Sequence, residues 1–221
     1  MSTQAQTTNL TETTLTPDLT YARLASDAQL ERAAHALKLN GFNVLVAENA
    51  ADAKAKLAEV IPAGAEVFTS SSTTFIQLGL FAEIDREGGR YDSVRVKLGK
   101  MDPKTQNREM QKLGATPDYI VGSVHAVTET GSLLIASATG SQLAPYAASA
   151  AHVVWIVGTQ KIVPNMDDAF NRLEQYTFPL EDQRAQKAYG VHSSISKVLI
   201  YNKEFVPGRA TLIFVKENLG F

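Results

Sequence analysis

The sequence predicts an α/β fold in which a mostly parallel β-sheet is flanked by helices. Helical and strand-like segments alternate with short connections over residues 26–69, and this order is typical of a parallel sheet covered by helices. Residues 153–157 (Val-Val-Trp-Ile-Val) form a continuous apolar run, as expected of a central strand that is buried on both faces. Both observations indicate a sheet with helices on its two sides.

Capping residues and glycines mark the ends of the first elements. Ser26 is a good N-cap, Gly41 stops the helix that follows it, and Asn49 caps a second helix. Gly88 and Gly89 end a further helical stretch, and Pro103 suits the first turn of a polar helix. The N-terminal half is therefore expected to contain helices over 26–40, 49–61, 75–84 and 102–113, and strands over 42–47, 66–69 and 91–96.

The second half continues with apolar runs that are separated by polar turns. Strands are expected over 119–124, 133–136, 152–157, 197–201 and 211–215, with a short helix over 141–150. A helix carrying Phe170, Leu173 and Tyr176 is expected to be interrupted at Pro179. No repeat or long linker divides the chain, so we expect one domain over residues 19–221. Residues 1–18, rich in Thr and Gln, are expected to be a disordered tail.

Composition excludes several classes of function. The formal net charge of −2 gives no electrostatic basis for binding nucleic acid. The absence of cysteine excludes disulfides, cysteine-ligated zinc, iron–sulfur ligation and a thiol nucleophile. The four histidines show no metal-binding spacing, so neither a metal nor a cofactor is predicted. No apolar run is long enough to insert into a membrane, and the N-terminus is unlike a signal peptide. We therefore expect a cytoplasmic protein.

Five consecutive hydroxyl residues form the first candidate site, at the turn from a strand into a helix. They are Ser70, Ser71, Ser72, Thr73 and Thr74. Such a turn offers backbone N–H groups and side-chain donors to an anion, although a single hydroxyl there can simply be an N-cap. The segment lacks the glycines and lysine of a P-loop. It predicts a site for a small anionic metabolite and does not indicate ATP or NAD.

The second candidate site is a polar corner between two apolar runs. Glu129, Thr130 and Gly131 lie there, and a carboxylate held at such a corner can act as a general base or nucleophile. Glu129 can equally accept backbone hydrogen bonds at a turn, and His125, a conceivable partner, is more typical of core or surface filling. Polar groups at strand ends are typical of functional sites, so Glu129 is the predicted catalytic residue. We also expect Glu129 to lie next to residues 70–74 in the fold.

Two further features rank lower. Lys161 follows the buried run and can reach a bound anion, although a loop lysine is usually solvated. His192, Ser193 and Ser194 resemble half of a nucleophile–base pair but lack the nucleophile-elbow context.

Two blocks of the sequence resemble the LUD-domain family, the LutC/YkgG-like proteins of lactate utilisation. The first is residues 119–124 (Tyr-Ile-Val-Gly-Ser-Val) with 127–133 (Val-Thr-Glu-Thr-Gly-Ser-Leu), and the second is residues 152–158 with 161–164 (Lys-Ile-Val-Pro). Gly208-Arg209 and the ending Leu219-Gly220-Phe221 are similar to the short, single-domain branch.

The resemblance implies a fold similar to the NagB/RpiA/CoA-transferase-like group and a role in using lactate or a related organic acid. It also implies iron–sulfur redox partner proteins. Some short members carry a cysteine cluster near residues 177–189, and this chain has none, so electron carriers would sit on other chains. A stand-alone isomerase or acyl/CoA-transfer enzyme using Glu129 and a non-catalytic assembly or regulatory subunit remain alternatives. The sequence leaves homo-oligomerisation open.

Overall fold

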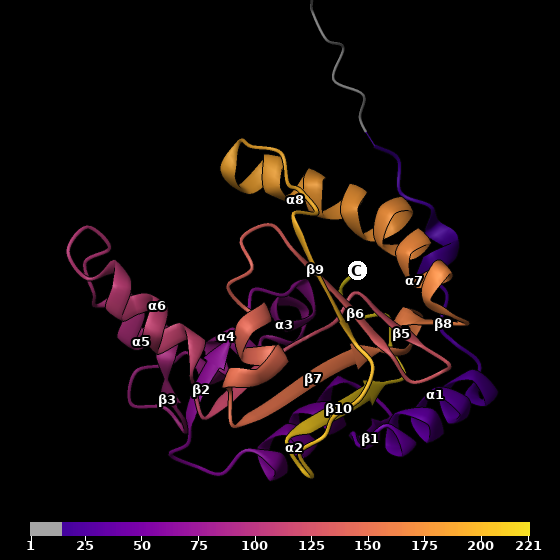
Figure 1. Cartoon of the computed structure of the whole chain (residues 1–221), viewed down its shortest axis with the longest axis horizontal. Helices are drawn as coiled ribbons and strands as arrows, with labels where there is room; N and C mark the ends of the chain where they lie inside the picture. Colours follow the sequence, from indigo (N-terminus) through magenta and orange to yellow (C-terminus); the bar gives the residue numbers. More distant parts are fainter. Residues whose placement is uncertain (1–14) are drawn as a thin grey trace, which may run out of the picture.

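A computed structural model describes residues 15–221 and contains two β-sheets (Figure 1). The larger sheet has six strands in the order β1-β10-β7-β4-β2-β3, and every pairing in it is parallel. Its strands are β1 (Asn43–Ala47), β2 (Glu66–Thr69), β3 (Asp92–Ser93), β4 (Tyr119–Gly122), β7 (His152–Gly158) and β10 (Ala210–Val215). The smaller, mixed sheet has the order β8-β5-β6-β9, formed by β8 (Ile162–Val163), β5 (Ala126–Thr128), β6 (Leu133–Ser137) and β9 (Lys197–Tyr201). The predicted α/β class is therefore confirmed.

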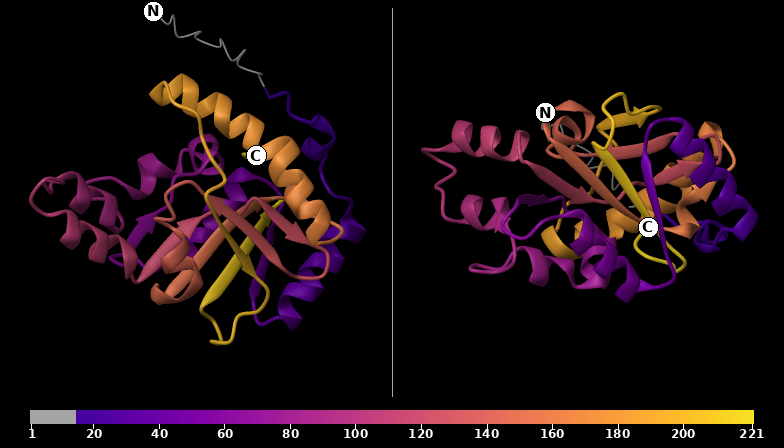
Figure 2. Two further views of the ribbon diagram at one scale, coloured as in Figure 1. Left: turned by 45° about the horizontal axis from the view of Figure 1, so that its top comes forward. Right: turned by 90° about the horizontal axis from the view of Figure 1, so that it is seen from below.

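Helices of several lengths connect the strands. The α-helices are α1 (Asp27–Leu39), α2 (Ala50–Val60), α3 (Thr73–Leu78), α4 (Leu80–Ile84), α5 (Val94–Gly99), α6 (Asn107–Ala115), α7 (Met166–Arg172) and α8 (Phe178–Tyr189). Shorter 3₁₀ or π segments are η1 (Leu19–Ala22), η2 (Pro145–Ser149), η3 (Thr159–Lys161) and η4 (Leu173–Thr177). Figures 1 and 2 show α5 and α6 projecting beyond the β3 end of the large sheet, and α7 and α8 following one another along one side of the molecule.

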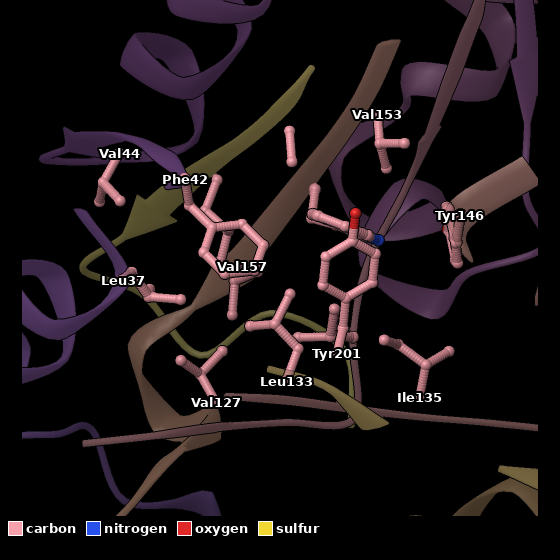
Figure 3. Close-up of a cluster of buried hydrophobic side chains, with 14 of the residues drawn as sticks. Leu37, Phe42, Val44, Val127, Leu133, Ile135, Tyr146, Val153, Val157 and Tyr201 are labelled. Carbon is pink, nitrogen blue, oxygen red and sulfur yellow. The ribbon is translucent and has the colours of Figure 1, made fainter. Parts of the chain in front are cut away.

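The main core lies between the two sheets (Figure 3). Val153 and Val157 of β7 face Leu133 and Ile135 of β6 across this layer, and Phe42 and Tyr201 pack there with ring centroids 5.4 Å apart. Helix α1 adds a stripe of buried residues at the helical spacing expected from the sequence, namely Leu30, Ala33 and Leu37. The second sheet thus covers part of one face of the first.

Two outer layers complete the packing. Helices α2, α3 and α4 cover the opposite face of the large sheet, where Leu57, Phe75 and Ile84 meet Val154 and Ile156 of β7. Helix α7 covers the outer face of the small sheet through Ala169. Strand β7 is consequently buried on both faces, as its continuous apolar run predicts.

Several local predictions need correction. Residues 91–96 do not form a full strand, because β3 pairs only two residues with β2 and the Ser93 hydroxyl then accepts a hydrogen bond from Val96 N to start α5. The helix expected over 102–113 begins at Asn107, after a turn held by Asp102. The short helix expected over 141–150 is present over 143–149, and its last five residues, Pro145–Ser149, form a π segment.

Pro179 does not interrupt the helical run at the end of α7. It lies in the first turn of α8, where an N–H group is not required, and the preceding residues form the π segment Leu173–Thr177. Residues 1–14 of the predicted tail lie outside the described residues. Asp18 already belongs to the folded part, since its side chain caps η1 and its amide donates to Gln175 O at 2.8 Å.

Candidate functional site

Polar residues that follow three parallel strands line one cavity at the carboxyl edge of the large sheet. Ser70 follows β2, Ser123 follows β4, and Lys161 follows β7 through the turn η3. These residues line a cavity of about 530 Å³, here called the carboxyl-edge cavity. In α/β proteins, ligands bind preferentially at this edge, and residues of β6, η4 and α8 and the terminal Phe221 complete the wall.

The Lys161 side chain is a buried polar group of the cavity wall. Only 2% of the residue is exposed, and its Nζ lies 3.3 Å from Thr74 Oγ1, 3.2 Å from Ser123 Oγ and 3.1 Å from Val124 O. All three partners are neutral oxygens. Within the described residues, the amine of Lys161 is thus hydrogen-bonded but has no carboxylate partner.

The backbone that positions Lys161 is tightly packed against the end of the chain. A Cβ atom at Gly158 would lie 2.7 Å from Glu217 O, so glycine allows β7 to turn into η3 at this point. The C-terminal residues also approach Thr74, whose hydroxyl donates to Leu219 O at 3.2 Å. Gly220 lies close enough that a Cβ atom would be 2.4 Å from Thr74 Oγ1. The Leu-Gly-Phe ending therefore fixes one of the partners of Lys161.

Burial and a neighbouring cation both act on the protonation of Lys161. Burial lowers the pKa of Lys161 well below 10.5, and the positive charge of Arg172 lowers it further. Burial also lowers the pKa of Arg172, to about 10, which leaves that guanidinium charged at neutral pH. The interior of this region therefore carries positive charge before any ligand is bound.

The hydroxyl segment 70–74 lies at the cavity, and its members have different partners. Ser70 is buried, and its hydroxyl is hydrogen-bonded to the Tyr146 hydroxyl at 2.7 Å. The exposed Ser71 accepts from Arg95 Nη2 at 3.1 Å. Ser72 begins α3 without making a side-chain capping bond, and Thr73 is half-buried. Thr74, fully buried, accepts from Lys161. The structure thus brings the predicted segment 70–74 together with Lys161.

Gly122 allows the Ser70–Tyr146 pair to sit against the end of β4. A Cβ atom at this position would lie 1.9 Å from the Tyr146 hydroxyl and 2.0 Å from Ser70 Oγ. Since both hydroxyls belong to the cavity wall, a larger residue would displace the wall itself.

Charged side chains on the cavity wall are predominantly basic. Arg95, Lys161 and Arg184 line it, with Glu181 as the acidic member. Arg184 is paired with Glu181 at 2.7 Å, and Arg95 Nε on α5 lies 3.8 Å from the carboxylate of Asp85, the residue that follows α4. The excess of basic groups favours an anionic occupant.

His125 also lines the cavity. The sequence alone favours a core or surface role for this residue over a role in a site. Its Nδ1 accepts a hydrogen bond from Ala136 N at 3.0 Å, which assigns the ring proton to Nε2. Burial, followed by the charges of Lys161 and Arg172, lowers the pKa of His125 to about 3. The imidazole is therefore neutral at physiological pH and offers one N–H donor.

Arg172 is a buried charge that the sequence does not reveal. Its Nη1 donates to His125 O and to Thr177 Oγ1, and its guanidinium lies 5.1 Å from the centre of the Tyr176 ring. Within the described residues, Nε and Nη2 are buried without a hydrogen-bond partner. An arginine in an amphipathic helix normally points to solvent, so only the three-dimensional packing identifies this one.

Glu129, Thr130 and Gly131 lie apart from the carboxyl-edge cavity. The Glu129 carboxylate accepts from Arg32 Nε at 2.6 Å and from Gln29 Nε2 at 3.1 Å, both on α1. Hydrogen bonding to Arg32 lowers the pKa of Glu129. Gly131 has a φ of +85° and packs against the backbone of α1. None of the three lines the cavity, so the expected neighbourhood of Glu129 and residues 70–74 is not formed.

The lower-ranked His192 is organised by a buried carboxylate. His192 Nδ1 lies 3.0 Å from Asp182 Oδ2, and Ser193 N donates to Asp182 Oδ1 at 2.7 Å. Ser193 and Ser194 reach the cavity wall. The Ser194 hydroxyl is hydrogen-bonded to the Ser196 hydroxyl, which gives this segment the character of a structured turn.

Two features are absent from residues 15–221. No group of three or more histidine, aspartate or glutamate side chains there could hold a metal ion. No helix in the same range is long and apolar enough to cross a membrane.

The fold and the cavity define an α/β domain with a basic, hydroxyl-lined cavity at the carboxyl edge of a parallel sheet. Its family follows from the sequence comparison: the LUD domain matches residues 30–215, so the chain belongs to the LUD-domain family, which is associated with lactate utilisation. No curated protein matches the sequence.

A solved structure shares the fold. The chain is similar to a DUF162 family protein from Deinococcus radiodurans, with a TM-score of 0.53 and 10% sequence identity, over 87% of this chain and 99% of that one. At this identity the likeness concerns the fold alone.

Proposed function

We propose that the carboxyl-edge cavity binds a small organic anion, and that the protein serves the use of lactate or a related organic acid in the cytoplasm. In this proposal, residues 70–74 and Lys161 belong to the binding site. The family association with lactate utilisation supports the metabolic setting, and the basic wall of the cavity supports the charge of the ligand.

The observation that carries the proposal is the buried Lys161 amine with neutral partners only. A buried ammonium without a counter-charge is unfavourable by several kcal/mol. A carboxylate or phosphate that enters the cavity would supply the missing charge. The Thr74 and Ser123 hydroxyls hold the amine in place for this contact.

Electron transfer is assigned to partner proteins. The chain has no cysteine for an iron–sulfur cluster, so a redox reaction that uses this site would place the cluster on another chain. The proposal therefore combines ligand binding here with iron–sulfur partners of the kind that the family resemblance implies.

Isothermal titration calorimetry tests the binding step. The wild-type protein is titrated with L-lactate, pyruvate, inorganic phosphate and CoA, and saturable binding of at least one anion is expected. Because a hydrogen bond to a charged group is worth about 1.5–3 kcal/mol, Lys161→Met should weaken that binding about tenfold or more. Lys197→Met, which removes an exposed lysine on β9, is the matched control. Binding that is equal in all three proteins would overturn the site.

Independent catalysis at Glu129 stays a prediction, separate from this proposal. A stand-alone isomerase or acyl-transfer enzyme would show turnover by the purified chain that is lost in Glu129→Gln. A non-catalytic subunit would co-purify with redox partners and tolerate that substitution. Because Glu129 contacts α1 and not the cavity, the geometry favours the ligand-binding role.

A further inference from the structure

We propose that the Lys161 amine is a nucleophile that forms an imine with the carbonyl group of a small 2-oxo acid in the carboxyl-edge cavity. This inference rests on the proposed function, because it requires that an organic anion enters the same cavity. It adds a reaction and a substrate class that anion binding alone does not require.

The position of the amine meets the first requirement of this reaction, which is a lysine shielded from water yet open to a cavity. Lys161 is buried and lines the cavity. No carboxylate is among its hydrogen-bond partners in the described residues, and a carboxylate would hold the side chain as an ammonium. Burial and the nearby Arg172 charge disfavour protonation, and a desolvated lysine next to another cation is the setting that activates an amine for attack.

The partners of the amine are three oxygens that can accept a hydrogen bond. The Thr74 hydroxyl donates to Leu219 O, so it accepts from Lys161, and Val124 O can only accept. These two contacts use both N–H groups of a neutral amine. Ser123 Oγ is the third partner of Nζ, at 3.2 Å, and its hydroxyl can accept a proton from the nitrogen while passing its own proton on. Ser123 is therefore placed to transfer a proton from Nζ to the carbonyl oxygen when the amine reacts.

The reaction balances without a redox partner. The lone pair of Lys161 Nζ forms a bond to the carbonyl carbon, and one N–H proton passes to the carbonyl oxygen by way of Ser123 Oγ. The resulting carbinolamine loses its hydroxyl group together with the second N–H proton as water, which leaves the C=N bond. Water reverses the same steps when the compound is released.

The cavity wall explains why the carbonyl compound should carry a carboxylate. Arg95 and Arg184 lie on the wall together with Lys161. Arg95 Nη2 donates a hydrogen bond to Ser71, a member of the hydroxyl segment 70–74. His125 adds a neutral N–H donor. A small 2-oxo acid presents a carboxylate to these donors and a carbonyl carbon to the amine.

Reductive trapping tests the inference. The full-length protein is incubated with pyruvate or glyoxylate and sodium cyanoborohydride, which delivers hydride to an imine carbon, and the modified lysine is located by peptide mass spectrometry. We expect saturable modification of Lys161 ahead of the exposed Lys197, suppression by excess L-lactate, which has no carbonyl to react, and loss of the labelled site in Lys161→Arg. At saturating pyruvate, where weaker binding no longer limits the rate, the Ser123→Ala variant should label Lys161 several-fold more slowly than wild type.

The outcomes separate this inference from the proposed function. If L-lactate or phosphate binds by calorimetry but label is spread over exposed lysines without preference for Lys161, the imine is wrong and the anion site stands. If no anion binds and Lys161 is not labelled, both are wrong. Labelling of Lys161 that does not saturate as the pyruvate concentration rises would also contradict the imine site, because the keto acid would then react without first binding in the cavity.

Discussion

Two buried basic side chains, Arg209 and Lys161, have opposite surroundings. Arg209 is 2.9 Å from Glu204 Oε2 and also donates to Tyr201 and to the carbonyls of Ala150, Pro145 and Tyr146. Lys161 has two hydroxyls and one carbonyl. The fold therefore supplies a counter-charge to Arg209 and, within the described residues, none to Lys161. Under the proposed function, this difference separates a structural group from a ligand-binding one.

The largest expected effect comes from breaking the compensated pair. Glu204→Gln keeps the shape of the side chain but leaves Arg209 as an unpaired buried charge, so the free energy of unfolding should fall by about 3–5 kcal/mol. Urea denaturation followed by circular dichroism measures this change. Glu48→Gln, which removes an exposed partner of Lys216, serves as the control and should leave the midpoint unchanged. A similarly small effect of Glu204→Gln would remove the contrast between the two cations.

Removal of the uncompensated amine should act in the opposite direction. Lys161→Met replaces a buried polar head, with the desolvation cost that its ammonium form carries, by an apolar group of similar length. The ligand-free protein should therefore become more stable, by an amount on the order of the 1–4 kcal/mol found where buried ion pairs were exchanged for apolar residues. The same urea experiment measures it. A loss of several kcal/mol would show that Lys161 is a structural group like Arg209.

Acid should destabilise the protein through His125. The pKa of His125 is about 3 in the folded chain and 6.5 in the unfolded one, so the unfolded state binds more protons between these values. The stability that the neutral ring contributes is complete above pH 6.5 and is lost progressively as the pH falls towards 3. Thermal melts over this range should show a shallower decline in His125→Gln, whereas an unchanged decline would argue against a buried, neutral ring.

The smallest effect is expected at the Glu129 corner. Its partner Arg32 is 56% exposed, and exposed ion pairs contribute little to stability. Glu129→Gln should therefore leave the affinity for the anion within about twofold of wild type and cause only a minor change in the melting temperature. Loss of activity or of ligand binding in this variant would restore the catalytic role that the sequence suggested.

Local patterns in the sequence predict much of the fold but only part of the cavity. The continuous apolar run of β7, the cap at Ser26 and the hydroxyl segment 70–74 are local signals, and the elements they indicate are present. Residues 91–96 have the composition of a strand, but β2 offers β3 a pairing of only two residues.

Contacts that are distant in sequence determine the remainder of the site. Lys161 is buried against Thr74 and Ser123, which are 87 and 38 positions away in the sequence. Because local patterns do not indicate such distant contacts, the sequence alone identifies Lys161 only as a loop lysine. Arg172 and Tyr146 reach the region through helices whose composition is ordinary. Glu129 lies in a turn between two strands, and such turns often hold functional residues. Its side chain points towards α1, however, where it binds Gln29 and Arg32. This orientation depends on the packing of the small sheet against α1, which local sequence patterns do not indicate.

The central claim is that an anion supplies the charge that Lys161 lacks, and proton uptake on binding tests it most directly. Calorimetric titration with L-lactate is performed in two buffers that differ in ionisation enthalpy, at a pH between the lowered pKa of Lys161 and its ordinary value of 10.5. A bound anion stabilises the ammonium and raises the pKa of Lys161, so wild type should take up a proton and Lys161→Met should not. Binding with the same proton stoichiometry in both proteins would contradict the account.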